Sequence, residues 1–278
     1  SSDVCSSDLE PVSTRLHTEV EGRGHPLMLL HGFTGDTSTM WPLGHELTGI
    51  RTVIAVDLPG HGETGVLPDH ADYRFENTVD ALAEAARQLG HDSVDVIGYS
   101  MGGRIALGLA VRHPDLVRSS VLIGATAGIV SDVERDIRRR TDDDLAEEIL
   151  TDGLESFVDY WMDLPLFETQ VRLGEDALHD AREQRLRNHP DGLAGSLRGS
   201  GSGNQPSLWR ELHRVAGPVL LMVGDEDPKF RSLAIRMASG IPRAEISVLP
   251  GAGHAAHLEN PPAAVIAIRT FLDEVTAL

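Results

Sequence analysis

A serine, an aspartate and a histidine occupy turns where they could act together in proton transfer or nucleophilic attack. The motif GYSMG at 98–102 lies between an apolar run and a helical pattern, which is the setting of a G-x-S-x-G nucleophile elbow. Asp227 and His254 follow two later apolar runs. In this arrangement His254 would take the proton of Ser100, and Asp227 would fix the imidazole tautomer. The pattern predicts Ser100, Asp227 and His254 as the catalytic residues.

The histidine and the aspartate each have neighbours that could replace them. His257 lies three residues beyond His254, and Asp225 and Glu226 share the turn of Asp227. We favour His254 because a preceding glycine permits a tight loop that projects the ring. We favour Asp227 because it lies furthest beyond its strand.

Backbone donors for a developing negative charge are expected at two places. The motif HGF at 31–33 follows the first apolar run of the sheet, and Met101 directly follows Ser100. In such a turn the N–H groups of Phe33 and Met101 would form an oxyanion hole. The motif DLPGHG at 57–62 is interpreted as a structural turn in which Asp57 binds loop amides.

Short apolar runs alternate with helical patterns along much of the chain. The helical patterns cover 77–89, 101–112 and 261–275. Continuous apolar runs between helices are typical of strands buried on both faces of a parallel sheet. A mostly parallel, doubly wound α/β sheet is therefore predicted, with strands at Pro26–Leu30, Thr52–Leu58, Ser93–Gly98, Ser119–Ile123, Pro218–Val223 and Glu245–Leu249.

This alternation stops between the fourth run, Ser119–Ile123, and the fifth, Pro218–Val223. Helical patterns at 144–150, 154–161 and 175–187, followed by a turn-rich segment at 199–203, predict a helical cap over 130–215. Residues 11–129 and 216–278 would form the core. Residues 1–10, SSDVCSSDLE, are expected to be a disordered tail or a sequence remnant.

Composition excludes several classes of protein. The chain has 24 basic and 43 acidic residues, a net charge of −19, so affinity for nucleic acid is not expected. No apolar run reaches the ~18 residues that span a bilayer, which predicts a cytoplasmic protein without membrane insertion. One cysteine, Cys5, excludes a cysteine-based zinc site. His254, His257 and Glu259 could imitate metal ligands, but His254 is already used, so no metal or cofactor is predicted.

Five motifs resemble those of the α/β-hydrolase superfamily and span nearly the whole chain. They are HGF at 31–33, DLPGHG at 57–62, GYSMGG at 98–103, GDEDPKF at 224–230 and HAAHLENP at 254–261. The resemblance implies an α/β-hydrolase fold with a helical cap insertion.

Three finer features are similar to one family within it. GYSMGGR places Arg104 four residues after Ser100, LRGSGSGNQPSLW occupies 197–209, and ERDIRRRTDDDLA at 134–146 precedes the aromatic run FVDYWMDLPLF. Together they resemble the 2-succinyl-6-hydroxy-2,4-cyclohexadiene-1-carboxylate synthases of menaquinone biosynthesis. The resemblance implies a lyase that eliminates pyruvate from 2-succinyl-5-enolpyruvyl-6-hydroxy-3-cyclohexene-1-carboxylate, with the triad acting as a base.

That substrate carries three carboxylates, for which arginine forks are natural partners. Arg104 shares a helix face with Ser100. Arg138 fits the family's carboxylate-binding arginine, although Arg135 and Arg139 are close, and the whole run could be a solvated helix face. The expected substrate-binding residues are Arg104, Arg138, Tyr99, Trp161, Arg198 and Lys229.

Two other functions stay open at this point. A serine hydrolase acting on small esters or on carbon–carbon bonds would use the same triad, whereas the density of cap arginines favours a small anionic carboxylate. A binding protein with a vestigial triad is the third possibility, and the complete triad argues against it. A monomer or weak homo-oligomer is expected.

Overall fold

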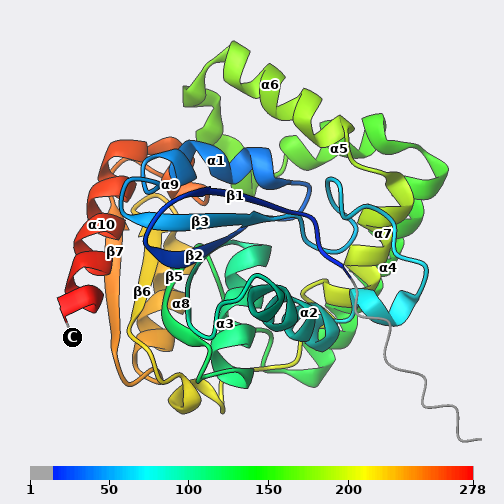
Figure 1. Ribbon diagram of the computed structural model, residues 1–278. Coiled ribbons are helices and arrows are strands. Elements are labelled where there is room, and N and C mark those ends of the chain that lie inside the picture. The colour runs from blue at the N-terminus through cyan, green and yellow to red at the C-terminus, as the bar shows by residue number, and fades with distance from the viewer. Residues whose placement is uncertain (1–14, 278) are drawn as a thin grey trace, which may run out of the picture.

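Seven strands form one sheet at the centre of the computed structural model, which describes residues 15–277 (Figure 1). The strand order is β1-β3-β2-β4-β5-β6-β7, and only β1 runs antiparallel to its neighbour. The predicted tail at 1–10 lies outside the described residues. The strands are β1 Thr18–Gly22, β2 His25–Leu30, β3 Arg51–Val56, β4 Val94–Tyr99, β5 Val117–Ile123, β6 Val219–Gly224 and β7 Ala244–Leu249.

The six predicted strands are present, and the doubly wound fold is confirmed. β1 was not predicted, because its sequence TEVEG is polar and mostly exposed. It pairs only with β3, from Thr18 opposite Val56 to Gly22 opposite Thr52. An edge strand of this kind is held by its backbone ladder and needs no apolar run.

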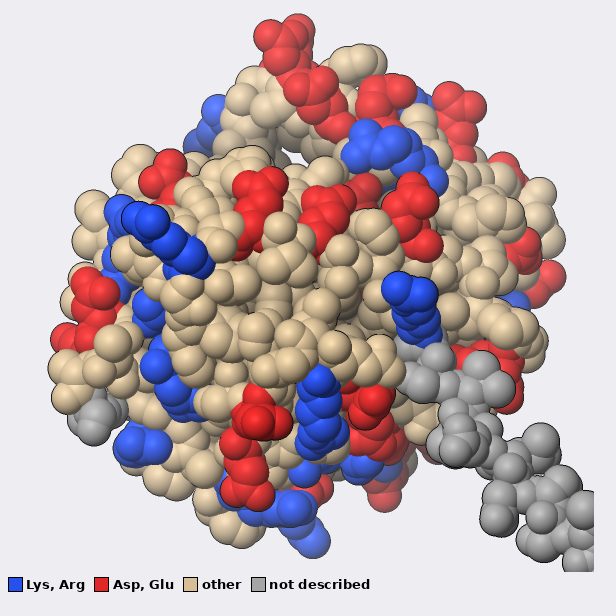
Figure 2. Space-filling view, viewed as in Figure 1, with Lys and Arg blue, Asp and Glu red and all other residues tan. Residues whose placement is uncertain are grey.

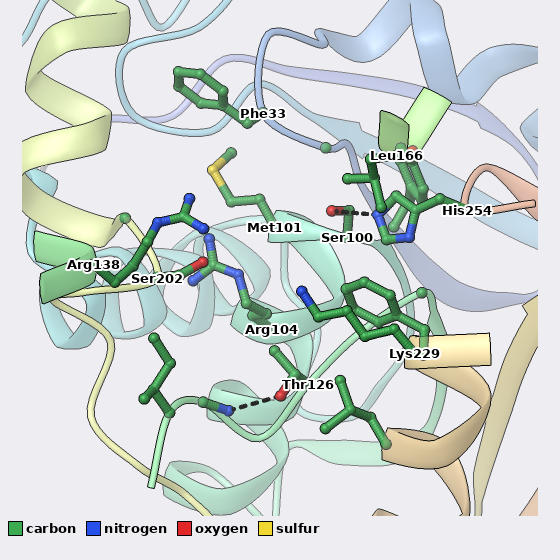
Figure 3. A pocket seen from close by; sticks show the side chains of 18 of the residues that line it. Phe33, Ser100, Met101, Arg104, Thr126, Arg138, Leu166, Ser202, Lys229 and His254 are labelled. Atoms are coloured by element: carbon green, nitrogen blue, oxygen red, sulfur yellow. Dashed lines mark hydrogen bonds between the residues drawn. The ribbon is translucent and has the colours of Figure 1, made fainter. Parts of the chain in front are cut away.

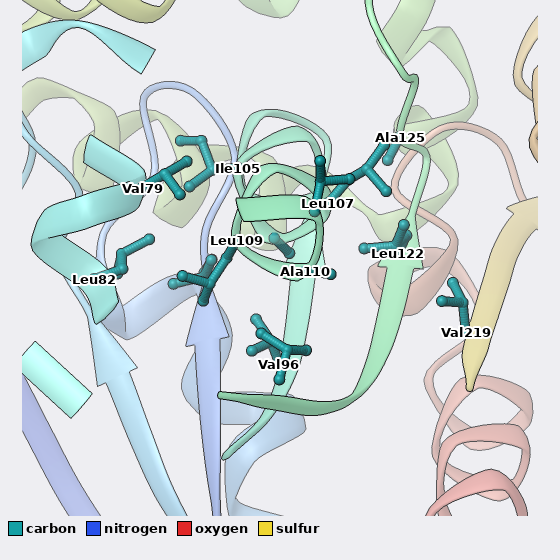
Figure 4. Packing of buried hydrophobic residues seen from close by; sticks show 14 of the residues in the cluster. Val79, Leu82, Val96, Ile105, Leu107, Leu109, Ala110, Leu122, Ala125 and Val219 are labelled. Atoms are coloured by element: carbon teal, nitrogen blue, oxygen red, sulfur yellow. The ribbon is translucent and has the colours of Figure 1, made fainter. Parts of the chain in front are cut away.

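Helices cover both faces of the sheet (Figure 1). Along β2, Met28 and Leu30 enter one apolar cluster, whereas Leu27 and Leu29 enter the other. Figure 4 shows the first cluster, where side chains of α2 and α3 pack against β4 and β5. The first face is covered by α2 Phe75–Gln88, α3 Met101–Arg112 and α8 Pro228–Ala238, and the second by α1 Thr37–His45 and α10 Pro261–Ala277.

Four α-helices and two 3-10 segments lie between β5 and β6, where the sequence predicts the cap. Helices α4, α5 and α7 have a small apolar core of their own, which includes Ile149, Phe157 and Leu193. The boundaries at 129/130 and 215/216 stay predictions. The elements are α4 Asp132–Thr151, α5 Leu154–Met162, η2 Pro165–Leu173, α6 Glu175–Leu186, α7 Pro190–Ser200 and η3 Leu212–Arg214. The remaining short elements of the chain are η1 His70–Tyr73 and α9 Ala256–Glu259.

Helix α7 corrects the expectation of a turn-rich segment beginning at 199. Its glycines permit close packing rather than a turn. A Cβ on Gly192 would lie 2.5 Å from the carbonyl oxygen of Gly60, and the backbone of Tyr73 similarly approaches Gly199. The helix therefore continues to Ser200, and the turns follow it.

Charge on the outside of the molecule is mainly acidic around the cap. Figure 2 shows acidic side chains over α5 and α6 at the top of the view. Within residues 15–277, no helix combines the length and the apolar character needed to cross a membrane.

Candidate active site

Ser100 occupies a sharp turn between β4 and α3. Its φ of 50° lies in the left-handed region, which is unusual for a residue other than glycine. The turn is possible because glycines lie two residues before and two residues after Ser100. A Cβ on Gly98 would lie 2.3 Å from the carbonyl oxygen of Gly102, and one on Gly102 would lie 2.2 Å from that of Leu30. The strained turn places the serine at the carboxyl edge of the sheet, where α/β folds bind ligands.

The structure brings the three predicted catalytic residues together. His254 Nε2 lies 3.0 Å from Ser100 Oγ, and His254 Nδ1 lies 3.0 Å from Asp227 Oδ2. The other oxygen of Asp227 accepts the N–H of Phe230 at 3.1 Å and so caps α8. Because the carboxylate can only accept, Nδ1 carries the proton and Nε2 is free to accept the proton of Ser100.

Glu259 holds the loop that carries His254. Its carboxylate accepts the N–H groups of Gly253 at 2.8 Å and Ala255 at 3.1 Å, on either side of the histidine. The ring of Phe230 packs 4.4 Å from that of His254 and limits its movement. Both Glu259 carboxylate oxygens are thus used in fixing the loop. Sequence reasoning considered Glu259 only as a possible metal ligand and missed this role.

His257, the competing histidine, lies beside the triad but outside it. Its ring packs 4.7 Å from that of Tyr99 and is 4% exposed. Burial, together with neighbouring His254, lowers the pKa of His257 to about 3. Its Nδ1 has no hydrogen-bond partner within the described structure. His257 is therefore a neutral packing residue at neutral pH.

This depressed pKa predicts a pH-dependent stability. Between pH 6.5 and pH 3 the unfolded chain binds a proton at His257 that the folded chain does not, so stability falls as pH falls. In His257→Gln the loss of unfolding free energy between pH 7.5 and pH 5.0 should be about 2 kcal/mol smaller than in the wild type. Urea unfolding at the two pH values measures this change in unfolding free energy. The exposed His213→Gln should follow the wild type, and equal losses in all three proteins would contradict the prediction.

The two predicted oxyanion donors border the same cavity as Ser100 (Figure 3). Met101 is the first residue of α3, where backbone N–H groups have no partner inside the helix. Neither the Phe33 N–H nor the Met101 N–H donates to another group in the described structure. Both are therefore available to a ligand.

The cavity has a volume of about 470 Å³ and lies between the sheet edge and the cap. Apolar and aromatic side chains form part of its wall, including the predicted Tyr99 and Trp161. The predicted Lys229 also borders it, with Nζ 5.5 Å from the centre of the Phe230 ring. Neutral polar side chains and one carboxylate, that of Glu134, also line it. Five of the lining residues are basic: Arg104, Arg138, Arg185, Lys229 and Arg236.

Arg104 and Arg138 lie together on one side of the cavity (Figure 3). Arg104 is 8% exposed and donates to the carbonyl oxygen of Ser200 at 3.2 Å and to Gln205 Oε1 at 2.8 Å. Burial, with a contribution from Arg138, lowers the pKa of Arg104 to about 10, so it remains charged at neutral pH. Arg138 pairs with Asp142 at 2.7 Å through Nε. Two guanidinium groups on the same side of the cavity favour the binding of an anion there.

Arg185, at the end of α6, is a cavity residue that sequence reasoning missed. It donates to the carbonyl oxygen of Ala181 at 2.7 Å, and its Nε has no acceptor within the described structure. Burial lowers its pKa. No carboxylate lies at ion-pair distance from Arg185 among residues 15–277. A helix rich in charged residues offers no sequence signal for the one that faces inward.

Arg198 does not line the cavity, which corrects the expectation that it binds substrate. It pairs with Glu147 at 2.9 Å on the surface of the cap. Helix α7 buries Leu193, Ala194 and Leu197 in the core of the cap. Residue 198 follows directly and lies outside that buried stripe.

The fold and the triad together define an α/β hydrolase, and the profile of the alpha/beta hydrolase fold family matches residues 25–261. The chain is 42% identical over 235 residues to the putative 2-succinyl-6-hydroxy-2,4-cyclohexadiene-1-carboxylate synthase of Bacillus subtilis (strain 168), covering 84% of this chain and 85% of that protein. The synthase of Salmonella paratyphi C (strain RKS4594) is 30% identical over 246 residues, 88% of this chain and 93% of that protein. The structure of MenH from S. aureus superposes with a TM-score of 0.90 at 32% identity, covering 94% of this chain and 99% of that one. The chain therefore belongs to the 2-succinyl-6-hydroxy-2,4-cyclohexadiene-1-carboxylate synthase family, which confirms the predicted resemblance.

Proposed function

We propose that the protein is a lyase of menaquinone biosynthesis. It eliminates pyruvate from 2-succinyl-5-enolpyruvyl-6-hydroxy-3-cyclohexene-1-carboxylate and leaves 2-succinyl-6-hydroxy-2,4-cyclohexadiene-1-carboxylate. One observation carries the proposal beyond family membership. The cavity that contains Ser100 Oγ is also lined by five basic side chains, a set suited to a ligand with several carboxylates.

The triad would act as a base. His254 Nε2 accepts the proton of Ser100, and the serine oxygen removes a ring proton of the substrate. The electron pair moves onto the ketone oxygen of the succinyl chain, where the N–H groups of Phe33 and Met101 stabilise it. When this enolate collapses, a double bond forms between ring carbons C2 and C3, and the existing C3=C4 double bond moves to C4=C5. The carbon–oxygen bond between C5 and the enolpyruvyl group breaks in the same step. The departing enolate takes a proton and becomes pyruvate. No acyl-enzyme is required.

The basic residues would bind the carboxylates and hold the ring against the triad. Arg104 and Arg138 offer one site, and Arg185 and Lys229 offer cations elsewhere on the wall. Tyr99 and Trp161 would pack against the ring. This set supports an anionic substrate over a neutral ester, because a buried cation without an anion is costly.

Removing the charge of Arg104 should weaken binding more than catalysis. A charge-assisted hydrogen bond contributes about 1.5–3 kcal/mol, so Arg104→Met should raise KM about 10- to 100-fold. Steady-state kinetics of pyruvate release measures this change. The matched variant Arg198→Met, which removes a surface guanidinium, should keep KM within about twofold. Equal effects of the two substitutions would contradict the assignment of Arg104 to the substrate.

The function is tested by offering the wild type both kinds of substrate. Pyruvate release from the succinyl-enolpyruvyl-cyclohexene acid is followed with a coupled dehydrogenase, and hydrolysis of a p-nitrophenyl ester is followed by absorbance. We expect fast pyruvate release with little ester hydrolysis. The reverse result would overturn the lyase and support a serine carboxylesterase or a carbon–carbon bond hydrolase.

The proposal also includes a cytoplasmic location, a monomer or weak homo-oligomer, and no cofactor or nucleic-acid partner. The net charge of −19 supports the absence of a nucleic-acid partner, because the protein would repel a phosphate backbone. Cell fractionation tests the location, light scattering tests the oligomeric state, and full activity of the purified protein after dialysis against a chelator tests the absence of a cofactor.

A further inference from the structure

His31, in the HGF motif, is buried beside the proposed oxyanion hole and makes two hydrogen bonds. Its Nε2 lies 3.0 Å from the backbone nitrogen of Leu58, and its Nδ1 lies 2.8 Å from the carbonyl oxygen of Gly32. A backbone N–H can only donate, so Nε2 is the acceptor in the first bond. The proton therefore resides on Nδ1, which donates to Gly32. These two contacts fix one neutral tautomer.

The carbonyl group of Gly32 belongs to the same peptide unit as the N–H of Phe33. In a trans peptide these two groups lie in one plane and point in opposite directions. The carbonyl oxygen of Gly32 also accepts the N–H of Gly35 at 2.9 Å. Both lone pairs of that oxygen are thus engaged on the protein side, while the Phe33 N–H has no partner in the described structure.

We propose that His31 is a positioning residue that aims and strengthens the Phe33 N–H as an oxyanion donor. A hydrogen bond to the carbonyl oxygen fixes the plane of the peptide. It also draws electron density toward that oxygen, which makes the N–H of the same unit a better donor. The inference rests on the proposed use of the Phe33 N–H and holds equally for elimination and for ester hydrolysis.

The surroundings of His31 keep its ring neutral. His31 is 0% exposed, and its ring centre lies 5.0 Å from that of His61. Burial lowers the pKa of His31, and burial with the neighbouring His31 lowers that of His61 to about 3. Asp36 and Asp57 act in the opposite direction without cancelling the effect of burial. The single ring proton therefore stays available to Gly32.

Two substitutions separate the contacts of His31. Asparagine can place its amide N–H near the position of Nδ1, which keeps the donor to Gly32 and loses the acceptor for Leu58. Glutamine can place its amide oxygen near Nε2, which keeps the acceptor and loses the donor. If the role of His31 is purely structural, the loss of activity in each variant should follow its loss of stability. If His31 positions the Phe33 N–H, the variant that loses the donor to Gly32 should lose more activity than its stability accounts for.

We expect His31→Gln to lower kcat about 10- to 100-fold with KM within about twofold, because a donor to the developing oxyanion is worth about 10²–10³ in kcat when removed outright. His31→Asn should keep kcat within about fivefold of the wild type even where urea unfolding shows it to be the less stable variant. Equal losses of kcat in the two variants, or an unchanged kcat in His31→Gln, would overturn the proposal. Turnover is measured as pyruvate release and as Ser100-dependent ester hydrolysis, so that failure of the lyase is distinguished from failure of the inference.

A measurement on the wild type keeps the inference testable where a variant does not fold. Nitrogen-15 NMR of the histidine rings reports which nitrogen carries the proton. We expect His31 to be neutral with its proton on Nδ1 at pH 7. A proton on Nε2, or a doubly protonated ring, would overturn the proposal without any reference to turnover.

Discussion

Replacing Ser100 with alanine is expected to lower the rate of pyruvate release by roughly 10³-fold at saturating substrate, in the range found for loss of a positioned general base. The hydroxyl lies 3.0 Å from His254 Nε2, and in the proposed elimination it carries the proton between ring and imidazole. Without it, the ring proton has no base at the required place. The Phe33 and Met101 N–H groups would remain, so KM should change little. A coupled dehydrogenase assay measures both constants.

The matched control for this experiment is Ser232→Ala. Ser232 is an exposed residue of α8 whose hydroxyl donates to the carbonyl oxygen of Pro228. This variant should keep the wild-type rate. Alanine also has a φ preference that disfavours the strained turn at residue 100, so circular dichroism should accompany the assay. A folded Ser100→Ala protein that retained full pyruvate release would refute a catalytic role for the serine.

Replacing Asp227 with asparagine should also lower kcat, roughly 10⁴-fold, for a different reason. The asparagine oxygen can still accept the Phe230 N–H, so the cap of α8 and the fold are preserved. Its amide group would donate toward His254 Nδ1 and so favour the tautomer with a proton on Nε2. An imidazole in that state cannot accept the proton of Ser100. Rates measured at saturating substrate test this expectation.

Asp225→Asn is the matched control, because Asp225 occupies the same turn. Asp225 Oδ1 accepts the N–H of Ala252 at 3.3 Å and does not contact His254. Its replacement should leave kcat within about twofold. A large loss in Asp225→Asn together with an active Asp227→Asn would reverse the assignment of the acid.

Most of the sheet could be predicted because β2 to β6 are almost entirely buried and are therefore continuous apolar runs. The edge strand β7 is only partly buried, yet its run of Ile246, Val248 and Leu249 still marked it. β1 lacked this signal, because its exposed sequence TEVEG is polar and only its pairing with β3 identifies it.

Helix α7 could not be predicted from the local sequence, because its glycines are typical of turns. These glycines are explained by tertiary packing, since the backbone of Gly60 approaches Gly192 and the backbone of Tyr73 approaches Gly199.

The triad could be predicted because each member stands in a local motif that carries its chemistry. The substrate-binding residues depend instead on which way a cap helix faces. Arg185 lines the cavity although nothing in its neighbourhood along the chain marks it. Arg198 follows Leu197, a core residue of the cap, and that single step places it on the surface. The direction of a helix face is set by tertiary packing, which a local pattern does not contain.

The separation of acidic groups on the outside from basic groups in the cavity affects how a ligand arrives. A protein of charge −19 repels a tricarboxylate at long range, and the cavity arginines attract it only once it has passed the cap. At 0.1 M salt the Debye length is about 10 Å, so the outer repulsion is screened while the enclosed attraction largely persists. Moderate ionic strength should therefore speed capture of the substrate. This is the opposite of the behaviour of an enzyme whose surface field steers its ligand inward.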